Sequence, residues 1–246
     1  MEIRNNVKAS TQIVERLTAN RPERGDFGKH ISDLTACLRR RWIEHHSTNK
    51  GASPYALTFL RGSALHQLLS GDDGTEEQSM EADGLIGTID HTDSKGGIWE
   101  WKTTMMWDGK LDNPSDWPES WLSKIAAYCY LANALSINVG VLHLQGDGRQ
   151  NRLASLRVYT VSFTDDELES NWHNLLGRSR IVTGGDEPPV MYRLGTWECK
   201  NCNYLAHCLP ELKVLGEYPK TVRPAMSLAE ALAGLQEVTS EADGSA

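Results

Sequence analysis

The sequence contains no run of about 18 apolar residues, so we expect no transmembrane helix. Its first residues, 1–6, lack the apolar core of a secretory signal. With 21 glycines and 9 prolines among 246 residues, of which 39% are hydrophobic, a fibrous or wholly disordered chain is also excluded. We therefore expect a soluble, intracellular (cytoplasmic) protein with no membrane partner.

The chain also has no excess of basic residues, since its net charge is −8. The acids are concentrated, however. Residues 71–83 hold six acids and no base, and residues 227–246 hold four acids and no base. The rest of the chain is slightly basic, and partner choice follows the local field rather than the total charge. The acidic total therefore counts only weakly against a nucleic-acid partner.

Hydrophobic periodicity predicts a mixed α/β fold around a small sheet. Residue 164 is a threonine followed three residues later by Glu167, which predicts a helix start with a capping box. On the helix expected after the second strand, an apolar stripe runs from Trp121 to Leu135. The expected helices span 31–47, 55–70, 118–136 and 164–183, and the expected strands span 84–91, 97–104, 138–146 and 154–163.

The first two strands carry the most informative chemistry. Glu100 and Lys102 share one face of their strand because side chains alternate. If the two strands pair as a hairpin, Asp90 comes close to Glu100, and two carboxylates converge beside an ammonium. Such oxygen ligands suit Mg²⁺ or Mn²⁺. The pattern Glu-x-Lys alone is also common as a solvated surface pair.

Two helical pairs could complete such a site. Gly62 and His66 lie four residues apart on one helical face, and the imidazole of His66 could join a metal shell. Lys124 and Tyr128 have the same spacing and could contact a phosphate or the carboxylate strand. A lone helical histidine is more often a surface or core residue, and Tyr128 also belongs to the apolar stripe.

Five cysteines, an odd number, argue against a disulfide framework. Cys199, Cys202 and Cys208 are spaced C-x2-C-x5-C, which indicates a metal centre needing one more ligand. Cys37, in a polar and basic stretch, is preferred over Cys129, which lies in an apolar helix run. The histidine at 207 could instead complete a zinc site, and spacing alone does not separate zinc from an iron–sulfur cluster.

Taken in order, these motifs resemble the PD-(D/E)XK nuclease superfamily, in particular its RecB-like branch with an iron–sulfur cluster. That branch includes the CRISPR-associated Cas-four exonucleases and AddB-type recombination nucleases. The resemblance runs from Cys37 to Cys208, most of the chain, and rests on ordered motifs that are each weak alone. The family usually has glutamine where this chain has Lys124, and a lysine can also contact phosphate.

The resemblance implies a restriction-endonuclease-like core, with the cysteine cluster linking the N- and C-terminal segments. It assigns metal-holding roles to His66, Asp90 and Glu100, and a water-assisting role to Lys102. Lys124 and Tyr128 would complete the catalytic set. The 4Fe–4S ligands would be Cys37, Cys199, Cys202 and Cys208, with zinc as the less favoured occupant.

The expected activity is that of a metal-dependent DNA exonuclease acting on single strands or DNA ends, in the 5′ to 3′ direction. The alternative is a non-catalytic or partner-dependent DNA-binding subunit with a structural cluster. Arg39, Arg40 and Arg41 are candidate DNA-backbone contacts, although they could equally form a solvated helix face. CRISPR-adaptation or recombination proteins are the partners that the resemblance implies.

Three tryptophans, Trp107, Trp117 and Trp121, could stack on unpaired bases, but packing of a loop against the core is the favoured interpretation. We expect residues 1–236 to form a single nuclease domain. Its iron–sulfur subdomain would comprise residues 20–50 and 190–215, and residues 237–246 would form a disordered tail.

Overall fold

The computed structural model describes residues 25–47, 64, 74–75, 77–104, 117–144, 154–190, 199 and 202–215. The predicted helix over 55–70 lies outside these residues except for position 64. Among the helices described, none is both long and apolar enough to cross a membrane.

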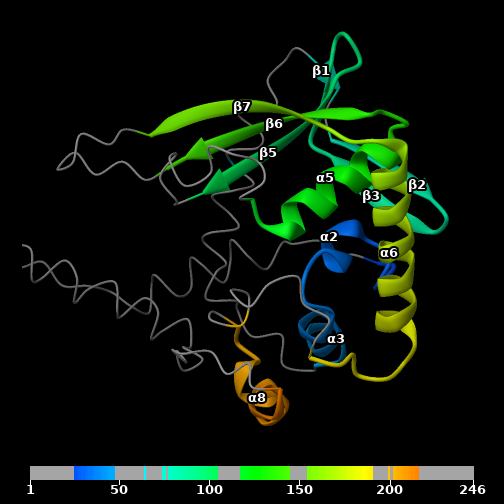
Figure 1. Cartoon of the computed structure of the whole chain (residues 1–246), viewed down its shortest axis with the longest axis vertical. Helices are drawn as coiled ribbons and strands as arrows, with labels where there is room; N and C mark the ends of the chain where they lie inside the picture. The colour runs from blue at the N-terminus through cyan, green and yellow to red at the C-terminus, as the bar shows by residue number, and fades with distance from the viewer. Residues whose placement is uncertain are drawn as a thin grey trace, which may run out of the picture.

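A mixed sheet forms the centre of the fold (Figure 1). β5 and β6 run parallel, and the other neighbouring strands are antiparallel. A separate hairpin of β2 and β3 lies outside this sheet. The predicted mixed α/β class is therefore confirmed. The strand order in the sheet is β1 (Gly74–Thr75), β4 (His91–Asp93), β5 (Ile98–Thr104), β6 (Ser136–His143) and β7 (Ser155–Ser162), and the hairpin comprises β2 (Gln78–Ala82) and β3 (Leu85–Ile89).

Helices pack beneath this sheet. In Figure 1, α5 and the long α6 lie on one side of β5, β6 and β7, with α2 and α3 beyond them and α8 at the far end. Ile137, Val139 and Val141 alternate along β6 and are fully or almost fully buried. Their burial against the helices forms the centre of the core. The helices span α2 (Ile31–Leu34), α3 (Leu38–His46), α5 (Glu119–Leu131), α6 (Asp165–Thr183) and α8 (Leu205–Val214).

The apolar stripe of α5 is confirmed along its first part, because Ile125 and Tyr128 are buried. Its predicted end is wrong. The helix stops at Leu131, and Asn133 follows with a φ of 51°, a left-handed conformation that ends a helix. Leu135 lies beyond this stop and is 53% exposed.

The start of α6 follows the sequence pattern. The side-chain oxygen of Thr164 accepts a hydrogen bond from the backbone amide of Glu167, and the Glu167 carboxylate accepts one from the Thr164 amide. This reciprocal arrangement satisfies two backbone donors at the helix N-terminus. The predicted capping box is therefore present.

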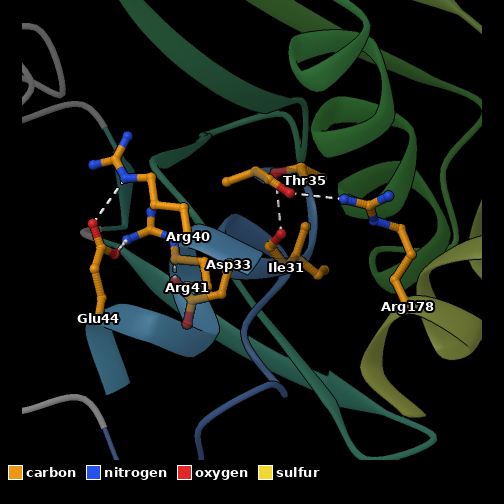
Figure 2. A network of polar contacts seen from close by, with 8 residues as sticks. Ile31, Asp33, Thr35, Arg40, Arg41, Glu44 and Arg178 are labelled. Carbon is orange, nitrogen blue, oxygen red and sulfur yellow. Dashed lines mark hydrogen bonds and ion pairs between the residues drawn. The ribbon is translucent and has the colours of Figure 1, made fainter. Parts of the chain in front are cut away.

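The predicted helix over 31–47 is divided into α2 and α3. The Thr35 hydroxyl donates a hydrogen bond to the Ile31 carbonyl, 3.1 Å away, and α2 ends there. Arg178 of α6 reaches the same turn (Figure 2) and donates to the carbonyl oxygens of residues 34 and 36, at 2.5 and 2.7 Å. These contacts leave Cys37 at the N-cap position of α3.

The predicted strand over 84–91 is also divided. β3 ends at Ile89 and pairs with β2, whereas β4 begins at His91 and pairs with β5. A tight turn joins β4 to β5, since the amide of Gly96 donates to the carbonyl of Asp93. The interruption falls at Asp90, which therefore lies where the small hairpin joins the central sheet.

Candidate active site

Three elements bring the predicted catalytic residues together. β5 carries Glu100 and Lys102, the next helix α5 carries Lys124 and Tyr128, and Asp90 lies between β3 and β4. In the β5–β6 register, Glu100 lies beside Val139 and Lys102 lies beside Val141, both buried core positions. The alternation of β5 thus places the carboxylate and the amine on one face, as the sequence predicted, and this face is the one that carries the buried residues of β6.

Alternation places the two tryptophans of β5 on the opposite face. Trp99 and Trp101 stack with ring centroids 5.3 Å apart. Trp101 lies over Gly140 of β6, where a Cβ atom would be 2.1 Å from the indole ring. The glycine therefore provides the space that the indole ring occupies on this face.

Glu100 is the most deeply buried charged group of the site, with no exposed surface. Its Oε1 atom accepts hydrogen bonds from both the Lys102 and the Lys124 ammonium groups, the latter at 2.6 Å. Its Oε2 atom is buried and has no hydrogen-bond partner among the described residues. Leaving a buried carboxylate oxygen without a partner is costly, so Oε2 is suited to bind a cation.

Asp90 is 7% exposed and is tied to the same strand. Its Oδ2 atom accepts a hydrogen bond of 2.8 Å from the backbone amide of Trp101, the residue between Glu100 and Lys102. The charge of Asp90 also acts on both lysines and favours their charged forms. The charges of the two carboxylates therefore act on the same two ammonium groups.

The two lysines respond differently to this environment. Burial lowers the pKa of Lys102, and the charge of Lys124 lowers it further, although Glu100 opposes both effects. For Lys124, burial acts to lower the pKa, but the attraction of Glu100 outweighs it and the pKa rises above its usual value. Burial also raises the pKa of Tyr128. One carboxylate oxygen thus holds two ammonium groups of unequal proton affinity.

The donor set fits a divalent cation in part. Asp90 and Glu100 supply two buried carboxylates, and the partnerless Oε2 atom of Glu100 offers an available lone pair. No group of three or more histidine, cysteine, aspartate or glutamate side chains within the described ranges is arranged to hold a metal ion. The third predicted ligand, His66, lies outside those ranges, as does Gly62.

The cysteines gather at a second place, away from β5. Cys37 at the start of α3 lines one small cavity together with Cys199, Cys202 and Cys208. Burial raises the pKa of the Cys202 thiol, and it raises that of Cys208 to about 11. The cavity is lined by residues from the N-terminal and C-terminal segments.

The remaining candidate ligands lie elsewhere. Cys129 is fully buried within α5, in the main core, where burial raises its thiol pKa to about 12. His207 is 54% exposed, and its Nε2 atom lies 2.8 Å from a carboxylate oxygen of Glu187. Neither residue lines the cysteine cavity.

The three candidate DNA-binding arginines all form ion pairs within the protein. Arg39 is buried and contacts Glu187 and, at 2.6 Å, Glu211. Arg40 and Arg41 both bind Glu44 at 2.8 Å (Figure 2). Contact with DNA stays a prediction for this stretch, and these ion pairs show that Arg39 connects α3 to the segment around the cysteines.

Two of the three candidate tryptophans pack against the core. Trp117 is 4% exposed and makes edge contacts with Trp121 and Tyr159. This agrees with the favoured interpretation of their role. Trp107 lies outside the described residues.

Sequence reasoning missed the residues that hold the cysteine segment in place, namely Arg178, Glu187 and Glu211. Arg178 lies in an otherwise ordinary amphipathic helix, and its partners are backbone carbonyls more than 140 positions away. No local pattern marks such a contact.

No family model and no curated protein sequence matches the chain. Among solved structures, the crystal structure of SSO0001 is similar with a TM-score of 0.54 and 17% identity, covering 81% of this chain and 95% of that one. This similarity shows a shared fold.

Two further solved structures are similar at a lower level. A phage-related exonuclease from Haemophilus somnus 129PT has a TM-score of 0.44 and 10% identity, covering 62% of this chain and 92% of that one. An alkaline exonuclease (LHK-Exo) from Laribacter hongkongensis has a TM-score of 0.42 and 10% identity, with coverages of 82% and 96%. The mixed sheet flanked by helices is consistent with the expected restriction-endonuclease-like fold.

Proposed function

We propose that this protein is a metal-dependent DNA nuclease that hydrolyses phosphodiester bonds at the site formed by Asp90, Glu100 and Lys102. The observation that carries the proposal is the fully buried Glu100 carboxylate, which shares one oxygen with two lysines and leaves the other without a described partner. A structural surface pair would be solvated and would not bury its carboxylate in this way.

Asp90 and Glu100 would hold the cation, with His66 as a further ligand. A bound Mg²⁺ or Mn²⁺ ion supplies Lewis-acid activation of water and charge stabilisation at the phosphate. Lys102 orients the attacking water, a role favoured by its lowered pKa and its position beside Glu100. The hydrogen bond from the Trp101 amide keeps Asp90 directed at the same place.

The family resemblance supports single-stranded DNA or DNA ends as the substrate and an exonuclease with 5′ to 3′ direction. The test is a product-length assay on strands labelled at the 5′ or the 3′ end, with Mg²⁺ or Mn²⁺. We expect Glu100→Gln and Lys102→Met to lower cleavage by at least about a hundredfold. Glu169→Gln, on the exposed surface of α6, is the matched control and should cleave normally.

Intact labelled DNA under every metal, or variants as active as the parent, would refute the proposal. Tight binding in a gel-shift without turnover would favour the alternative of a DNA-binding subunit. A residual activity shared equally by all variants would indicate a contaminating nuclease.

The cysteine cavity is proposed to hold a 4Fe–4S cluster through Cys37, Cys199, Cys202 and Cys208. Its support is that the four side chains line one cavity while Cys129 lies in another part of the core. Anaerobically purified protein should then be brown, whereas a zinc protein is colourless. Cys37→Ala should lose iron and Cys129→Ala should keep it, and the reverse result would show that the fourth ligand is wrong.

A further inference from the structure

The two oxygens of Glu100 are used unequally. Oε1 accepts from both lysine ammonium groups, and Oε2 has no partner in the part of the chain that the structure describes. The cation proposed above would therefore approach Oε2, at a carboxylate that already carries two positive neighbours. Binding of a cation and retention of both ammonium contacts oppose each other electrostatically.

The charges of the site are balanced without any ligand. Asp90 and Glu100 supply two negative charges, and Lys102 and Lys124 supply two positive charges close to them. The attraction of a divalent cation to the carboxylates is consequently offset by the ammonium groups. A phosphate entering with the cation would restore the balance, because it gives one ammonium a new partner.

Lys124 is better placed than Lys102 to change partner. It belongs to α5 rather than to the strand of Glu100, and its side chain is 21% exposed, compared with 12% for Lys102. Both ammonium groups also lie over an aromatic ring, Lys124 over Tyr128 at 5.1 Å and Lys102 over Trp121 at 5.7 Å, so the difference between them lies in exposure and in the element that carries them.

We propose that Lys124 is a positioning residue that couples cation binding to phosphate binding. In the free protein it neutralises Glu100, and it transfers to the phosphate when cation and nucleic acid bind together. This inference rests on the proposed function, since it assumes that the carboxylates hold a divalent cation. Its consequence is that the free protein binds the cation weakly and takes it up with its substrate.

The test measures Mn²⁺ affinity from the electron paramagnetic resonance signal of free Mn²⁺, with and without thymidine 5′-monophosphate. This mononucleotide carries a phosphate but no phosphodiester bond, and its own Mn²⁺ binding is subtracted. For the parent protein we expect weak binding that the nucleotide strengthens. Because binding coupling is reciprocal, Mn²⁺ must strengthen nucleotide binding by the same factor.

Lys124→Gln should bind Mn²⁺ about tenfold more tightly than the parent when the nucleotide is absent, since one nearby positive charge is lost. The same variant should show a smaller strengthening by the nucleotide. Lys124→Arg keeps the charge and should retain the coupling. Lys29→Gln is the matched control, because it also removes a lysine paired with a carboxylate, but at an exposed position.

An unchanged Mn²⁺ affinity and unchanged coupling in Lys124→Gln would overturn the inference, provided that Glu100→Gln abolishes binding in the same assay. The proposed function would then stand. Mn²⁺ binding that is absent from the parent, or unaffected by Glu100→Gln, would overturn both the role of Lys124 and the proposed function. Should Lys124→Gln fail to fold, Lys124→Met provides the same charge change for the same comparison.

Discussion

Replacing Arg178 by alanine should destabilise the turn between α2 and α3. The guanidinium is buried, and it donates hydrogen bonds to the carbonyl oxygens of Leu34 and Ala36 at 2.5 and 2.7 Å. These are carbonyls at the end of a short helix, where the backbone has no helical partner to offer. The substitution removes both donors and leaves the two oxygens in a largely buried place.

The magnitude follows from these two contacts. A hydrogen bond that involves a charged group stabilises the folded state by about 1.5–3 kcal/mol. Both bonds come from one side chain, so their effects do not add fully. We expect a loss of about 3 kcal/mol in the free energy of unfolding, or about 6–12 °C in the melting temperature.

The assay is urea unfolding followed by circular dichroism. Arg180→Ala is the control, because Arg180 lies two residues further along the same helix and is exposed. Arg178→Lys keeps the charge but cannot reproduce the planar fork, and it should lose about half as much stability as the alanine variant. If Arg178→Ala and Arg180→Ala unfold at the same urea concentration, the turn does not depend on these bonds.

A second readout connects the turn to the cysteine cavity. Cys37 directly follows one of the two accepting carbonyls and lines the cavity. In protein stripped of metal, loosening the turn should expose its thiol, so alkylation at Cys37 should be several times faster in Arg178→Ala. Mass spectrometry separates this site from the other thiols, and the rate at the buried Cys129 should not change. Equal rates at Cys37 in parent and variant would contradict this connection.

Two further predictions concern the central sheet. Gly140→Ala should destabilise the fold by about 1–3 kcal/mol, because its Cβ atom would overlap the Trp101 ring; an unchanged urea midpoint would show that the ring can move aside. The pKa of Asp93 lies below its usual value, because its carboxylate accepts hydrogen bonds from Trp99 Nε1 and from two backbone amides, including that of Gly97. The ionised Asp93 carboxylate therefore stabilises the folded protein above the unfolded-state pKa of about 3.9. This stabilisation is lost as the pH falls through the folded-state pKa of Asp93. In urea titrations between pH 5 and pH 3, the free energy of unfolding of Asp93→Asn should fall less than that of the parent. An equal fall in both proteins would contradict this role of the Asp93 carboxylate.

Features set by neighbours in the chain could be predicted from the sequence. The capping box at Thr164 depends on two residues within one turn. The shared face of Glu100 and Lys102 depends only on strand alternation. Both appear in the structure because the interactions that produce them are local.

Features set by distant partners could not be predicted in this way. Three consecutive arginines in the sequence suggest a DNA contact, but Arg39 is paired with Glu187 and Glu211, 148 and 172 positions away. The sequence around a basic side chain does not indicate which distant acidic residue will pair with it. For Lys124 the sequence leaves a phosphate or the carboxylate strand as alternative partners, and the structure shows its ammonium bound to Glu100.

The interruption at Asp90 places one of the two acids where the small hairpin joins the central sheet. A continuous strand over 84–91 would follow one sheet and place its residues by alternation alone. Instead, β3 pairs with β2 and β4 pairs with β5, so the chain changes sheet at Asp90. At this junction the carboxylate reaches the Trp101 amide of β5, one residue from Glu100. The backbone amide of a β5 residue therefore holds the Asp90 carboxylate, although the strand that precedes Asp90 belongs to the other sheet.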